Sequence, residues 1–72
     1  MYMKRRASEP TLGDLAAHRA VARLGNLFPQ PWVISYRTMA GLTFFIARRP
    51  GLELTEATAQ ALEEQLWRWE TA

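Results

Sequence analysis

The chain has 72 residues, of which 49% are hydrophobic, and it carries a formal net charge of +2. This length accommodates a single domain, and a chain of this size buries only about 60% of the surface that it exposes when unfolded. Because there is no cysteine and only one histidine, His18, disulfides and a structural zinc site are excluded as sources of stability, which leaves oligomerisation or partner binding.

Residues 1–10 are predicted to form a flexible basic arm, and residues 11–72 a single domain. The arm has few apolar residues and contains the run Lys4-Arg5-Arg6. Thr11 offers an N-cap hydroxyl, so a helix is expected to begin near Leu12. The apolar residues that follow recur at helical spacing and fall on one face: Ala16, Ala17, Ala20, Val21, Leu24, Leu27 and Phe28.

After the prolines at positions 29 and 31 the hydrophobic period changes from helical spacing to alternation, which is typical of strands. Two strands are predicted over residues 32–38 and 42–49, joined by the loop Met39-Ala40-Gly41. This loop sets a register that places Tyr36 opposite Phe44, Ile34 opposite Ile46, and Trp32 opposite Arg48. The large apolar side chains then share one face, except for Phe45, which is expected on the other face with Arg37 and Arg49.

Pro50 and Gly51 are predicted to end the second strand, since proline cannot donate to the ladder and a Pro-Gly pair favours a type II turn. A second helix is expected to follow, with Thr55 as its N-cap. Its apolar stripe consists of Ala59, Leu62, Leu66 and Trp69. Trp67 falls outside this stripe, among glutamates, on the face that is expected to meet water.

The predicted fold is therefore a small α+β domain in helix–β-hairpin–helix (αββα) order. An isolated hairpin is only marginally stable and has two open edges. Three arrangements remain open: the helices pack on opposite faces of the hairpin, two protomers pair edge to edge, or another protein supplies a further strand. Each of them gives Phe45 a contact.

Two surfaces are candidates for partner binding. The first is Trp67 with Glu63 and Glu70 beside it, because exposed tryptophan is enriched at binding hot spots. The second is the outer hairpin face, with Phe45, Arg37 and Arg49. These surfaces predict a small non-catalytic module that occupies a surface of a larger protein. By size and by its lack of catalytic groups, the chain resembles the small inhibitors with which phages and mobile elements block host machinery, a resemblance of kind that no sequence motif carries.

Two alternative functions are compatible with the sequence. One is nucleic-acid binding, because arginine binds phosphate by bidentate hydrogen bonds. Its candidate residues are the basic groups Lys4, Arg5, Arg6, Arg19, Arg23, Arg48 and Arg49. The other is a homodimeric structural subunit that pairs through the edge of the hairpin.

Little in the sequence favours catalysis. His18 lies four residues after Asp14, which is typical of a surface pair on a helix. There is no cysteine nucleophile, glycine-rich phosphate loop or pair of metal ligands, so neither enzymatic activity nor a cofactor is expected. No tract approaches the roughly 20 apolar residues of a membrane span, and the N-terminus lacks the apolar region of a signal peptide, so a cytoplasmic location without membrane contact is expected.

Overall fold

The structure is a computed structural model that describes residues 12–71. They form five elements in the order α2 (Leu12–Leu27), β1 (Val33–Met39), β2 (Leu42–Arg49), β3 (Leu52–Glu56) and α3 (Ala59–Thr71). The predicted α+β class is confirmed, with one strand more than expected. The predicted basic arm and the predicted N-cap at Thr11 lie outside the described residues. Between residues 12 and 71, no helix is both long and apolar enough to cross a membrane.

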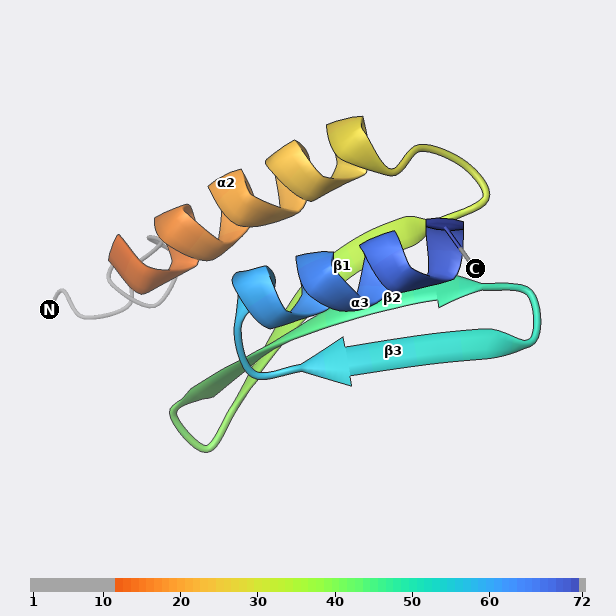
Figure 1. Cartoon of the computed structure of the whole chain (residues 1–72). Helices are drawn as coiled ribbons and strands as arrows, with labels where there is room; N and C mark the ends of the chain where they lie inside the picture. The colour runs from red at the N-terminus through yellow and green to blue at the C-terminus, as the bar shows by residue number, and fades with distance from the viewer. Residues whose placement is uncertain (1–11, 72) are drawn as a thin grey trace, which may run out of the picture.

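The three strands form one antiparallel sheet in the order β1-β2-β3, and both helices lie on the same face of it (Figure 1). Helix α2 lies along β1, where the rings of His18 and Tyr36 meet edge-on at 6.0 Å. Helix α3 lies along β2 and β3, and its Gln65 donates a hydrogen bond to Glu56 at the end of β3. The arrangement with the helices on opposite faces is therefore wrong.

A two-residue turn, rather than the expected three-residue loop, joins β1 to β2. Ala40 and Gly41 have φ angles of 54° and 79°. Positive φ at both central residues is the requirement of a type I′ turn, which matches the twist of the flanking strands. The predicted register is therefore wrong by one residue, and Tyr36 pairs with Phe45 instead of Phe44.

The shift in register changes which side chains face the helices. Phe45 lies beneath them and is 9% exposed, so its predicted position on the outer face is wrong. Successive residues of a strand point to opposite faces, so a slip of one residue exchanges every side chain. The sheet residues of the core are Phe45, Ala47 and Leu54, with Ile34, Tyr36 and Leu52 packed against them.

The third strand follows directly from the turn at Pro50 and Gly51. Gly51 has a φ of 81°, as a type II turn requires after proline, and the chain turns back so that Leu52 pairs with Arg49. Leu52 and Leu54 then point toward the helices, because side chains alternate along a strand. The chain itself thus supplies a strand to one of the two edges that the predicted hairpin left open.

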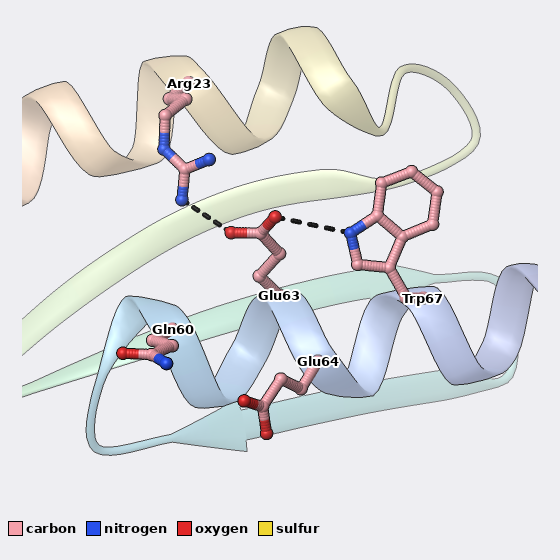
Figure 2. Close-up of a pocket in the computed structure, with 5 residues that line it drawn as sticks. All are labelled: Arg23, Gln60, Glu63, Glu64 and Trp67. Atoms are coloured by element: carbon pink, nitrogen blue, oxygen red, sulfur yellow. Dashed lines mark hydrogen bonds and ion pairs between the residues drawn. The ribbon is translucent and has the colours of Figure 1, made fainter.

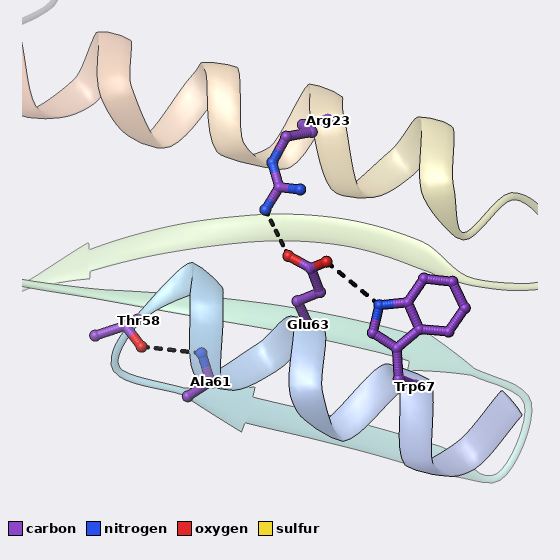
Figure 3. Close-up of polar contacts among 5 residues, drawn as sticks. All are labelled: Arg23, Thr58, Ala61, Glu63 and Trp67. Carbon is purple, nitrogen blue, oxygen red and sulfur yellow. Dashed lines mark hydrogen bonds and ion pairs between the residues drawn. The ribbon is translucent and has the colours of Figure 1, made fainter. Parts of the chain in front are cut away.

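Helix α3 begins three residues later than predicted. Thr55 is part of β3, and the cap is Thr58, whose Oγ1 accepts a hydrogen bond of 3.1 Å from the backbone N–H of Ala61 (Figure 3). Leu62 and Leu66 are fully buried, as predicted.

Trp69 is 48% exposed, so its predicted place in the core is wrong. It lies at the edge of the buried arc, in the last turn of α3. Trp32 is the buried indole near this end of the core, and its Nε1 donates a hydrogen bond of 2.7 Å to Glu70 in the same turn of the helix.

Candidate protein-binding surfaces

A groove runs between the two helices, and Trp67 lies in it (Figure 2). The groove has a volume of about 450 Å³. We call it the tryptophan seam, and the residues that line it are Arg23, Gln60, Glu63, Glu64 and Trp67. Glu63 and Trp67 face α2 because they lie one turn apart on the side of α3 next to the buried stripe.

Two contacts fix the orientation of Trp67 although the residue is 46% exposed. Its ring lies edge-on against Phe28, with the centroids 4.7 Å apart and the planes at 65°. Its Nε1 donates a hydrogen bond of 3.3 Å to Oε2 of Glu63. The indole therefore has one side against the protein and one side open to solvent. The prediction that Trp67 is exposed is confirmed, and its contacts with α2 add a fixed geometry.

Glu63 joins the two helices through its carboxylate. Oε1 accepts a hydrogen bond of 2.6 Å from Nη2 of Arg23, while Oε2 accepts the bond from Trp67 (Figures 2 and 3). The bond from Arg23 is the largest cause that lowers the pKa of Glu63 below its ordinary value, and the bond from Trp67 is the next. An ionised Glu63 thus holds both neighbours at neutral pH.

A second, smaller groove of about 180 Å³ lies on the other side of Trp67. Its lining is largely apolar and comes from the turn between α2 and β1 and from the end of α3: Leu27, Phe28, Pro29, Gln30, Pro31, Trp32, Trp67 and Glu70. The carboxylate of Glu70, which was predicted to lie beside Trp67, lines the same groove as Trp67 and accepts the hydrogen bond from the buried indole of Trp32. Trp67 forms the wall that the two grooves share.

The face of the sheet that the helices leave uncovered is a second candidate. We call it the open sheet face, and its residues alternate with those of the core: Val33, Ser35, Arg37, Met39, Leu42, Phe44, Ile46, Arg48, Glu53 and Thr55. Leu42 and Val33 are 60% and 63% exposed, whereas Ile46 in the middle is 6% exposed. A hollow of about 240 Å³ lies around Phe44 and Ile46.

The structure separates the residues that were predicted to share the outer hairpin face. Arg37 lies on the open sheet face, as expected, and Phe45 is buried on the opposite face. Arg49 is also on the helix side, where its guanidinium carbon lies 5.2 Å from the ring centroid of Trp32. Arg49 therefore makes a cation–π contact with Trp32, the residue that the wrong register placed opposite Arg48.

The arginines proposed for nucleic-acid binding lie on different surfaces. Arg23 is in the tryptophan seam, and Arg48 is on the open sheet face, where its Nε lies 3.1 Å from Oε1 of Glu53. Arg19 is exposed on α2. Lys4, Arg5 and Arg6 lie outside the described residues. Within residues 12–71, these side chains do not form one basic patch.

Sequence reasoning missed two residues that contact the α3 side chains of the tryptophan seam. Arg23 was assigned to a basic cluster and Phe28 to the core, although both also contact α3 side chains in the seam. Their partners are about 40 residues away in the chain, and only the packing of α2 beside α3 brings them together. The continuation of α2 beyond Gly25 to Leu27, which places Phe28 directly after the end of the helix, was the available signal.

Among residues 12–71, no group of three or more His, Cys, Asp or Glu side chains is placed to hold a metal ion. No protein-family model matches the chain, and neither a curated protein nor a solved structure matches it significantly.

Proposed function

We propose that the chain is a small non-catalytic module that binds a larger protein through the tryptophan seam. The observation that carries this proposal is the state of Trp67, which is half exposed but held between Phe28 and Glu63. An aromatic side chain whose rotamer is already fixed loses little conformational entropy on binding. Tryptophan is also among the residues most enriched at binding hot spots.

The charges of the seam suggest the chemistry of the partner surface. Glu63 is already paired with Arg23, whereas Glu64 is exposed in the same groove. A partner segment with an apolar side chain against Trp67 and a basic side chain near Glu64 complements this arrangement. Such pairs at the rim of an interface mainly select the partner and raise the association rate.

The mechanism is steric, because the module needs only to cover a surface that its partner uses. Steric occupation of this kind would suit an inhibitor of host machinery encoded by a phage or mobile element. The same contact would also serve an adaptor.

The test is affinity capture with the full chain from a lysate of its native host, before and after nuclease treatment. We expect a stoichiometric protein that survives nuclease and is lost with Trp67→Ala. Trp69→Ala is the matched control, since Trp69 lies on the same helix and is similarly exposed but lines neither groove. Glu64→Lys should weaken capture without altering the thermal melt.

The result distinguishes this function from nucleic-acid binding. A phosphate contact weakens steeply with salt, by about one unit of log–log slope for each neutralised phosphate, whereas an interface centred on Trp67 depends on salt much less. Capture that requires intact nucleic acid, or that is lost equally with Trp67→Ala and Trp69→Ala, would refute a role for the seam.

A further inference from the structure

The open sheet face is an apolar surface that residues 12–71 leave without a covering element. Three of its apolar side chains, Val33, Met39 and Leu42, are more than half exposed. Phe44 and Ile46 lie behind them around the hollow. Small domains gain stability by burying such a face against a second layer, and a chain of this length has little core of its own to substitute for it.

We propose that a second copy of this chain covers the open sheet face and forms a two-fold dimer with the helices on the outside. Two packed sheets lie about 10 Å apart, with the side chains of their inner faces interdigitated. The apolar residues around Ile46 would form the centre of this interface. Edge-to-edge pairing, which the sequence suggested, would leave them exposed.

Two of the three charges on this face, Arg37 and Glu53, are placed so that they can pair between two copies, while Arg48 is already paired with Glu53 within the chain. Arg37 lies on β1 and Glu53 on β3, and both line the hollow. Arg37 pairs with Phe44 of the central strand, whereas Glu53 pairs with Arg48, so the midpoint between the two charges falls at Ile46.

A two-fold axis at Ile46 places Arg37 of each copy against Glu53 of the other. A closed dimer requires this reciprocity, since residue i contacts residue j and j contacts i. Because the two charges occupy diagonal corners of the face, the strands of the two copies cross at a large angle, as in orthogonal sheet packing. Glu53 accepts from Arg48 through Oε1, and its second oxygen can accept from the other copy.

This dimer extends the proposed function without depending on it. The tryptophan seam lies on the helix side of the sheet, so both seams stay exposed when the open sheet faces meet. A dimer with two seams would bind a repetitive or dimeric partner with avidity.

The first measurement is sedimentation equilibrium of the full chain over a range of concentrations, together with Arg37→Glu and Glu53→Arg. We expect the unaltered chain to dimerise and each variant alone to associate at least about 100-fold more weakly, because like charges then face each other. An equimolar mixture of the two variants should dimerise again, since both contacts of the mixed dimer join opposite charges. Circular dichroism checks that each variant is folded.

Val33→Lys provides an independent test of the apolar part of the face. Val33 is 63% exposed in the single chain, and its partner Arg48 lies only two residues along β2 from Ile46, so the variant should fold and remain monomeric. Trp69→Ala is the control and should leave the dimer unchanged. A monomeric unaltered chain, a dimer that survives Val33→Lys, or a mixture that fails to associate would overturn the proposal. Since Trp67 lies outside this interface, capture through the seam can succeed or fail separately.

Discussion

Phe44 and Phe45 are neighbours on β2, yet they belong to opposite surfaces of the sheet. Phe45 is packed beneath the helices, whereas Phe44 lines the hollow on the open sheet face. The residue type and the strand are the same, so the difference comes entirely from what the rest of the chain brings to each face. The helix side is a completed core, whereas the opposite side keeps apolar side chains that the other elements of residues 12–71 leave exposed.

The largest expected effect separates these two phenylalanines. Phe45→Ala should destabilise the fold by about 3–5 kcal/mol, because it removes a core aromatic and leaves a cavity. Phe44→Ala should cost clearly less when measured at a protein concentration too low for association. Urea unfolding followed by circular dichroism gives both values. Equal losses would mean that the register is wrong.

A smaller effect compares the two tryptophans of α3. Trp67→Ala should destabilise by about 1 kcal/mol, since an aromatic pair such as that with Phe28 contributes about 0.5–1.5 kcal/mol beyond its buried area. Trp69→Ala should stay within about 0.5 kcal/mol, as for a surface substitution. Thermal melts of both variants test this order, which is the reverse of the expectation from helical spacing. A larger loss of stability for Trp69→Ala than for Trp67→Ala would mean that Trp69 belongs to the core.

The smallest effect concerns the pH dependence of the helix side. The folded-state pKa of Glu63 is lowered, so its stabilising contribution is complete above the unfolded value of about 4.3 and is lost as the pH falls through the lower folded-state value. The difference in melting temperature between the unaltered chain and Glu63→Gln should therefore be constant around neutral pH and become smaller in acid.

Arg23→Gln sharpens this measurement, because the bond from Arg23 is the first cause of the lowered pKa. When Arg23→Gln is present in both proteins, the acid-dependent part of the difference in melting temperature between Glu63 and Glu63→Gln should become smaller. An acid-dependent difference that is the same with and without Arg23 would contradict the seam geometry.

The elements themselves could largely be predicted from local patterns. The apolar residues of α2 recur at helical spacing, and Leu62 and Leu66 do so in α3. Alternation in β1 and β2 indicated two antiparallel strands. The short alternating stretch Leu52–Glu56 carries the same signal, but it was missed because Pro50-Gly51 was interpreted as the end of the sheet, when it is the turn that continues it.

The binding surfaces were less predictable than the elements. The exposure of Trp67 could be read from its place among glutamates, and Glu63 was correctly placed beside it. The hydrogen bond between Glu63 and Arg23 could not be predicted from the sequence, because it depends on how α2 packs against α3. Phe45 was assigned to the wrong face because one residue in the turn decides the register, and that turn contains Ala40 at a positive φ, which alanine seldom adopts.

The sequence by itself determined the α+β class, the helical stripes, the alternation of the strands and the excess of acidic residues in α3. These are local properties, because the spacing of apolar residues selects the period of the backbone. Only the tertiary structure decided that both helices cover one face, that Trp32 rather than Trp69 is buried, and that Arg23 reaches Glu63. Those outcomes depend on register and on contacts between distant segments, where a shift of one residue exchanges core and surface.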